Sequence, residues 1–257
     1  MSEQQAGQKA FTPSFALLSI GALAALVVLI GLGYWQVERL HWKEALIERV
    51  NTRIAAPPVP LLSLLPVDPA RPLTPDALEY RPVRVTGRFR HKAELFYYAT
   101  LKGEAGFHVY TPLEIEGAEP KIILVNRGFI PADKKDPATR PQTMPSGTVA
   151  ITGLLRWPDQ RKPNRFMPDN DQKANIYFWR DLSAMIAQTK AEPANVLPYF
   201  LYADKTAADV LPVGGVTIID FPNSHLGYAI TWFGLALTLI GVYLALLVSR
   251  LKPQKGR

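Results

Sequence analysis

Residues 15–34 read FALLSIGALAALVVLIGLGY and include no charged side chain over twenty positions. Residues 228–248 read YAITWFGLALTLIGVYLALLV and are equally free of charge. An α-helix needs about twenty apolar residues to cross the roughly 30 Å hydrocarbon core of a bilayer. These two stretches meet that requirement and no other part of the sequence does. The pattern predicts two transmembrane helices, the first over residues 15–34 and the second over residues 225–248.

The composition of the 257-residue chain favours a few apolar spans attached to a polar domain. Hydrophobic residues make up 48% of the sequence and charged residues 20%. The absence of cysteine excludes a disulfide framework, a thiolate zinc site and covalent haem attachment through a CxxCH motif. With 29 Lys and Arg against 22 Asp and Glu, the net charge is +7. Such a balance is typical of proteins that bind nucleic acid, anionic membranes or anionic ligands.

The charges beside the spans predict the topology. Residues 249–257, SRLKPQKGR, carry four cations and no acid, which is typical of a cytoplasmic flank. An even number of spans places residues 1–14 on the same side. We therefore expect residues 35–224 to lie outside the cytoplasm, in the periplasm, which disfavours nucleic acid as a partner. The first span is expected to be an uncleaved anchor, because its apolar run exceeds that of a signal peptide and no A-x-A site follows it.

The segment between the spans is expected to be rich in β-strands. Helical periodicity continues over residues 35–50, a Pro-rich connection covers residues 55–75, and the β-rich core occupies residues 80–220. One short helix is expected near residues 181–190. The expected strands are residues 81–89, 94–100, 108–115, 121–130, 148–157, 175–179, 196–202 and 215–220. Short consecutive strands favour an antiparallel sheet that curls into a small barrel, so the fold class is membrane α+β.

No motif of an enzyme occurs in the chain. The sequence has no G-x-S-x-G elbow, P-loop, H-E-x-x-H or G-x-G-x-x-G, and its four histidines are isolated from one another. The acidic pair Asp169 and Asp171 lies in a turn-like run, where carboxylates usually cap the backbone. We therefore expect no catalytic residue, and a membrane enzyme of haem or lipid metabolism is disfavoured.

Each junction between a span and the central segment carries polar and aromatic residues. His225 falls in the first turn of the second span, because Asn223 or Ser224 can cap the helix. Its imidazole is either bonded to water and headgroups at the interface or available as an axial ligand to haem iron. On the first helix, Arg39 lies between Trp35 and Trp42 on one stripe. A cation–π contact or a lipid phosphate explains this arrangement, and a haem propionate is the functional alternative.

A stripe of small residues runs along the second span. Its members recur at steps of three and four residues: Gly227, Thr231, Gly234, Thr238, Gly241 and Ala245. Small residues let two helix backbones approach closely within a bilayer. The stripe therefore predicts packing against the first span, which has small residues of its own at Gly21, Ala24, Ala25 and Gly31. Since His225 lies about 200° around the helix from Gly227, we expect it to face away from this stripe.

Six stretches, taken together in this order, resemble the Surfeit-locus family of cytochrome c oxidase assembly factors. They are residues 33–43 (GYWQVERLHWK), 125–131 (VNRGFIP), 153–156 (GLLR), 163–168 (PNRFMP), 175–182 (NIYFWRDL) and 223–233 (NSHLGYAITWF). The resemblance covers about residues 15–250 and suggests a bacterial member. It implies assembly rather than turnover, with the main domain periplasmic in the cell inner membrane and both termini cytoplasmic.

The resemblance also implies a ligand and partners. Family members help to mature the catalytic subunit of haem–copper terminal oxidases, and bacterial members are thought to bind haem A. His225 matches the histidine at the head of the family's second span, so the candidate haem site is His225 on the iron, with Arg39, Trp35 and Trp232 around the macrocycle. Expected partners are the oxidase catalytic subunit, haem A synthase and the lipid bilayer. The alternative is a scaffold that stabilises an assembly intermediate without binding haem. For residues 127–131, RGFIP, the family offers no agreed role; Gly128 and Pro131 can serve to turn and end a strand.

Overall fold

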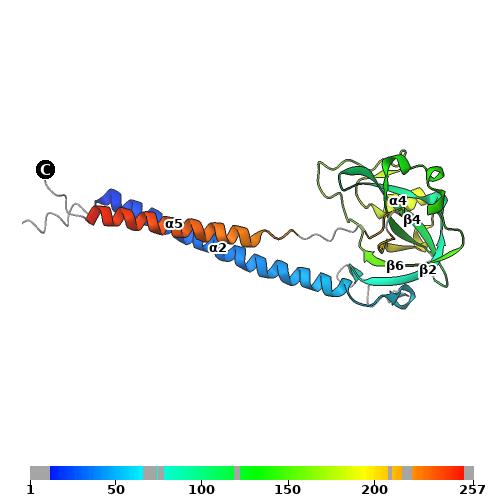
Figure 1. The fold of residues 1–257 in the computed structure, drawn as a ribbon, viewed down its shortest axis with the longest axis horizontal. Helices are drawn as coiled ribbons and strands as arrows, with labels where there is room; N and C mark the ends of the chain where they lie inside the picture. Colours follow the sequence, from blue (N-terminus) through cyan, green and yellow to red (C-terminus); the bar gives the residue numbers. More distant parts are fainter. Residues whose placement is uncertain are drawn as a thin grey trace, which may run out of the picture. The chain divides into compact units, whose positions relative to one another are not determined.

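The computed structural model describes residues 12–65, 74, 78–118, 122–207, 210–215 and 222–251. The chain divides into two compact units. The first comprises Met1–Arg49 and Asp220–Arg257, and contains most of the first long helix and all of the second. The second is Val50–Ile219, which contains the β-strands (Figure 1).

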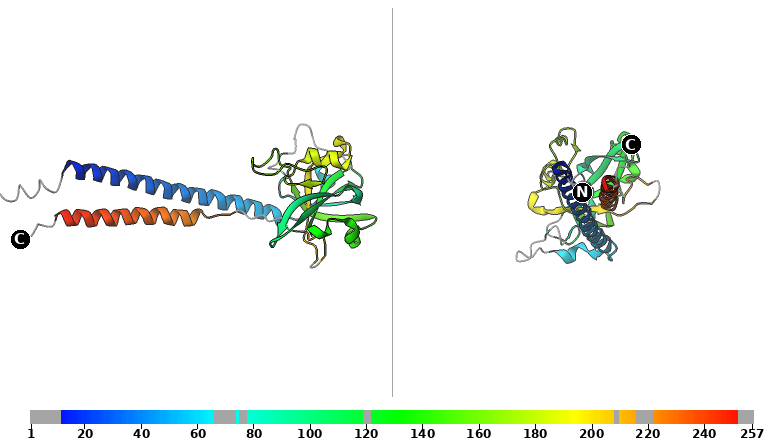
Figure 2. Two further views of the ribbon diagram at one scale, coloured as in Figure 1. Left: turned by 90° about the horizontal axis from the view of Figure 1, so that it is seen from above. Right: turned by 90° about the vertical axis from the view of Figure 1, so that its left-hand side faces the viewer.

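Both predicted spans are helical. Helix α2 runs without interruption over Pro13–Ile54 and therefore includes the predicted extension at residues 35–50. Helix α5 covers His225–Leu251 and begins at the residue predicted to start the second span. Each helix is long and apolar enough to cross a membrane. Within the first unit α2 and α5 lie side by side (Figures 1 and 2).

The face by which α5 packs on α2 is not the predicted one. A Cβ atom built on Gly227, Gly234 or Gly241 of α5 would meet nothing within 4 Å, and the same is true of Gly21 and Gly31 of α2. The small-residue stripe is therefore open, and the expectation that it packs against the first span is wrong. The residues buried on α5 are instead Ala229 and Ala236.

Aromatic and polar contacts explain why a different face is used. The Phe233 ring lies over Gly33, where an added Cβ would come within 2.7 Å of Cε1. At the other end of the helix pair, the rings of Phe15 and Tyr243 stack with centroids 6.3 Å apart. The Tyr243 hydroxyl donates a hydrogen bond to Ser19 Oγ at 2.7 Å. Interhelical hydrogen bonds and close side-chain packing both stabilise helix pairs in a bilayer, and here both lie on this face.

Five strands of the second unit form a closed barrel. Its strands are β2 (Pro82–Phe89), β4 (Glu104–Ile115), β5 (Ile122–Pro131), β6 (Thr148–Arg156) and β8 (Val196–Ala203). They pair in the order β2-β6-β8-β5-β4, and β4 pairs back onto β2. Strand β3 (Leu95–Leu101) adds to β4, β7 (Ile176–Tyr177) adds to β3, and β1 (Val59–Pro60) adds to β2. The expected small barrel is thus confirmed.

The expectation of an antiparallel sheet is only partly correct. Strands β5 and β8 pair in parallel, as do β1 with β2 and β3 with β7. A parallel pair requires a crossover connection, and helix α4 (Leu182–Thr189) supplies part of it before β8. Asp181 caps this helix, because its carboxylate accepts the N–H of Ala184 at 3.1 Å. The predicted strand at residues 215–220 lies almost wholly outside the described residues.

The barrel interior forms the main hydrophobic core. Inward-facing side chains from β2, β4, β5, β6 and β8 fill it, and η1 (Leu61–Leu64) contributes Leu61 from the Pro-rich connection. On the outer surface α4 places Met185 against Tyr110 and Phe200. Parts of the predicted Pro-rich connection, residues 66–73 and 75, are not among the described residues. The closed barrel leaves short connections, including η2 (His91–Ala93) and η3 to η5 (Ala132–Lys134, Pro137–Thr139, Pro141–Thr143), to carry polar groups.

Candidate functional site

The first turn of α5 places His225 against α2. Its Nδ1 atom lies 2.8 Å from Oε1 of Gln36, a residue that is only 8% exposed. An amide oxygen can only accept, so Nδ1 carries the proton in this contact. No hydrogen bond joins Nε2 to any residue that the structure describes. As expected, His225 faces away from the small-residue stripe, and it points to α2.

The other predicted haem residues lie around this pair. Trp35 precedes Gln36 and is 54% exposed. The Arg39 guanidinium lies 3.9 Å from the ring centroid of Trp42, which is the predicted cation–π contact. Trp232 is half-buried two turns after His225, on the same side of α5. His225 contacts Gln36 and Arg39 contacts Trp42, and among the described residues no hydrogen bond or ring contact joins Arg39, Trp35 or Trp232 to His225.

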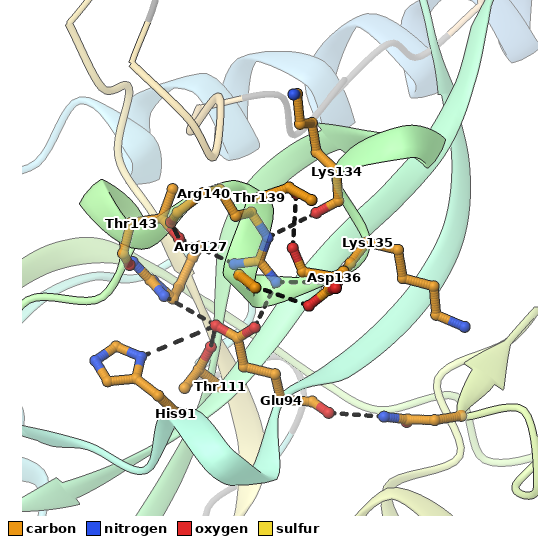
Figure 3. Close-up of polar contacts among 12 residues, drawn as sticks. His91, Glu94, Thr111, Arg127, Lys134, Lys135, Asp136, Thr139, Arg140 and Thr143 are labelled. Atoms are coloured by element: carbon orange, nitrogen blue, oxygen red, sulfur yellow. Dashed lines mark hydrogen bonds and ion pairs between the residues drawn. The ribbon is translucent and has the colours of Figure 1, made fainter.

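A second concentration of polar groups is buried in the β unit, around Glu94 (Figure 3). Glu94 Oε2 accepts from Arg140 Nη2 at 2.6 Å, and Oε1 accepts from Arg127 Nη1 at 3.2 Å. Thr111 donates its hydroxyl to the same carboxylate at 3.5 Å, and His91 Nδ1 lies 3.9 Å from it. The Arg140 side chain is fully buried. The pKa of Arg127 lies below its ordinary value because burial lowers it, and the Glu94 carboxylate offsets only part of that shift.

Both arginines of this cluster also bind the connection that follows β5. Arg140 donates from Nε to the Lys134 carbonyl at 2.8 Å and from Nη1 to Thr143 Oγ1 at 3.0 Å. Arg127 Nη2 donates to the Thr143 carbonyl. The cluster therefore fastens η3 to η5 onto the barrel. Lys134, Arg140 and Thr143 belong to one connection, whereas Glu94 precedes β3. The ion pairs and hydrogen bonds of this cluster, which we call the Glu94 clasp, therefore have a structural role.

A β-bulge aims Arg127 at this clasp. Phe129 pairs with His108, and Asn126 pairs with Tyr110. Arg127 and Gly128 of β5 therefore lie together opposite the single residue of β4 between those two partners. Gly128 has φ +120°, and a Cβ there would overlap the Val213 carbonyl. Asn126 Oδ1 accepts the N–H of Gly128 at 3.0 Å. Gly128 thus re-aims a side chain within β5 rather than ending the strand, a frequent role of bulges, whereas Pro131 ends it as expected.

The SURF1 family matches residues 23–237. Surfeit locus protein 1 of Mus musculus is 38% identical over 221 residues, which are 80% of this chain and 67% of that protein. Surfeit locus protein 1 of Takifugu rubripes is 34% identical over 239 residues, 86% of this chain and 93% of that protein. The chain belongs to the SURF1 family. SURF1-like protein of Drosophila melanogaster is 33% identical over 238 residues, with 86% and 74% coverage.

Membership of the SURF1 family gives the chain a role in cytochrome c oxidase assembly, because the family consists of assembly factors for that oxidase. The matched region contains α2 from residue 23, the whole β unit and the first half of α5. It therefore includes both the His225–Gln36 pair and the Glu94 clasp.

Sequence reasoning missed three residues of this SURF1 family member. Gln36 belongs to the motif at residues 33–43, but the sequence analysis gave it no role of its own. The feature that could have indicated it is a polar side chain one turn from Gly33 on an apolar helix. Glu94 and Arg140 are common surface residue types with no local pattern that predicts burial. Arg127 was noted within residues 127–131, although its ion pair with Glu94 joins positions 33 residues apart.

Proposed function

We propose that this chain holds haem A during the assembly of cytochrome c oxidase and presents it to the catalytic subunit. His225 Nε2 is the ligand to the iron in this proposal. The observation that carries it is the state of His225, which has Nδ1 occupied by Gln36 and Nε2 without a partner among the described residues. A neutral imidazole with one free nitrogen is the form that binds haem iron.

The residues beside His225 suit the remainder of such a ligand. Haem A, when bound, offers an iron that takes an imidazole, a flat apolar ring and propionates that take cations. Trp35 and Trp232 provide aromatic surface, and Trp35 is more than half exposed. Arg39 is a cation one turn beyond Gln36 on α2, and its contact with Trp42 leaves the guanidinium edge for a carboxylate. The proposal includes no catalytic residue, so haem A would pass to the catalytic subunit chemically unchanged.

The proposed setting is a bacterial inner membrane with both termini in the cytoplasm and the β unit in the periplasm. The cationic residues 249–257 and the two apolar helices support it. A reporter that works only in the cytoplasm should be active when fused after Arg257 and inactive when inserted after Gly147. Alkaline phosphatase activity from the fusion after Arg257 would contradict this topology. The proposed partners are the catalytic subunit, haem A synthase and the bilayer lipids.

The haem proposal is tested by the absorption spectrum of the full chain purified from cells that make haem A. The wild type should show a Soret band, and His225→Ala should remove most of it. His41→Ala is the matched control, because His41 is an exposed histidine of the same helix pair and should leave the band unchanged. A wild-type band in His225→Ala, or no band in any preparation, would favour the alternative, a scaffold that supports oxidase assembly without binding haem.

A further inference from the structure

Gln36 is an unusual residue in its position on α2. The three buried residues of this helix are Phe15, Gly33 and Gln36, so Gln36 is its buried residue with a polar side chain. Burying an amide without a hydrogen bond is energetically unfavourable in proteins. The side chain avoids that cost through the 2.8 Å contact of Oε1 with His225 Nδ1. Its partner is the residue to which the proposed function gives the iron.

We propose that Gln36 is a positioning residue that fixes the tautomer and the ring orientation of His225. This inference rests on the proposed function, because it gives Gln36 its purpose through the Nε2 ligand. A neutral imidazole has one N–H, and an amide oxygen accepts that proton at Nδ1. Nε2 is then left with its lone pair and without a proton. Metal-binding histidines commonly donate a hydrogen bond from the N–H of their second ring nitrogen to an oxygen in this way, and this bond also holds the ring in place.

The position of Gln36 makes the arrangement rigid. Gly33, one turn earlier on the same buried face, is covered by the Phe233 ring, so the two helices are in close contact beside the hydrogen bond. His225 begins α5, where an imidazole without this bond would be free to rotate about its side-chain torsions. Holding it in one orientation before the ligand arrives lowers the entropy lost on binding.

A purely structural role for Gln36 gives a different expectation. The bond would then serve only to join α2 to α5, as the hydrogen bond between Tyr243 and Ser19 does farther along the same pair. That second bond has a similar length, 2.7 Å, and involves no candidate ligand. Tyr243→Phe is therefore a matched control that removes one inter-helix hydrogen bond and leaves His225 untouched.

The first experiment uses the wild-type chain in lipid nanodiscs without haem. Nitrogen-15 NMR of labelled histidine, with the His225 signals assigned by their loss in His225→Ala, distinguishes Nδ1–H from Nε2–H. We expect the Nδ1–H form for His225 at neutral pH, and a mixture or the Nε2–H form in Gln36→Leu. A wild-type His225 that is mainly Nε2–H would overturn the inference without the need for any variant.

The second experiment is a titration of the same nanodiscs with haem A, followed by the Soret band. Gln36→Leu should weaken binding about 10- to 100-fold, the usual effect of removing the hydrogen-bond partner of a metal-binding histidine. Gln36→Glu keeps an acceptor oxygen and should recover most of the affinity, and Tyr243→Phe should bind as the wild type does. If Gln36→Leu binds normally while His225→Ala does not, the inference fails and the proposed function stands. If His225→Ala also binds normally, the proposed function itself fails.

Discussion

Replacing Glu94 with Gln should strongly destabilise the β unit. The Glu94 carboxylate is 98% buried and is paired with Arg140 at 2.6 Å and with Arg127 at 3.2 Å. The amide of Gln would keep one acceptor but turn two N–H donors toward a guanidinium. Each hydrogen bond to a charged group contributes about 1.5–3 kcal/mol. Breaking a buried ion pair by removing one partner costs about 3–5 kcal/mol, so we expect a loss of that size in the free energy of unfolding.

The assay is urea unfolding of the full chain in detergent micelles, followed by near-ultraviolet circular dichroism. Glu114→Gln is the matched control, because Glu114 pairs with Arg90 at 2.6 Å while both side chains are more than 40% exposed. Exposed pairs contribute about 0–1 kcal/mol. Glu94→Gln should also speed tryptic cleavage between η3 and η5, which the clasp holds. Equal losses in the two variants would refute the argument that burial makes the Glu94 clasp important.

Five substitutions, one of them followed over a range of pH, test other parts of the structure. Gly33→Leu should separate α2 from α5 and Gly234→Leu should not, as measured by disulfide trapping of cysteines introduced across the pair; the reverse result would restore the small-residue stripe as the contact face. Gly103→Ala should lower the free energy of unfolding by about 1–3 kcal/mol through backbone strain alone. Gly128→Ala should lower it by more, because the added methyl group also overlaps a carbonyl; equal unfolding midpoints would contradict this. Burial lowers the pKa of His108 from its ordinary 6.5, so the stability that its neutral form gives is complete above pH 6.5 and declines as the pH falls through that value. His108→Gln should therefore flatten the fall in unfolding free energy between about pH 8 and 5.5, and an unchanged slope would disprove it.

The elements that the sequence predicted well are those with a strong local pattern. Two uncharged stretches of about twenty residues sufficed for α2 and α5, and β-branched runs between turn residues located β2, β4, β5 and β6 to within a few residues. The short helix expected near residues 181–190 is α4, which the structure places at Leu182–Thr189. Each of these signals lies within a few residues of the element it predicts, so no long-range information was needed.

The features that were missed depend on residues far apart in the chain. The parallel pairing of β5 with β8 is decided by which strands meet when the barrel closes, and the α4 crossover has the same local pattern whichever strand β8 joins. Gln36 and His225 are 189 positions apart, and Glu94 and Arg140 are 46 apart. The stripe on α5 was a correct observation of small residues, but spacing within one helix does not say which face its neighbour takes.

The pairing order of the barrel has a consequence for how the chain matures. Strand β8 lies between β5 and β6 and is the last barrel strand to be synthesised. Until residue 203 has emerged, β5 and β6 each expose an unpaired edge, and such edges recruit other strands. A nascent or truncated chain that stops before residue 196 would therefore be an open curved sheet, prone to aggregate and to proteolysis. Premature termination between the end of β6 at residue 156 and the start of β8 at residue 196 should remove the protein altogether rather than leave a shortened barrel, even though four of its five strands would already be made.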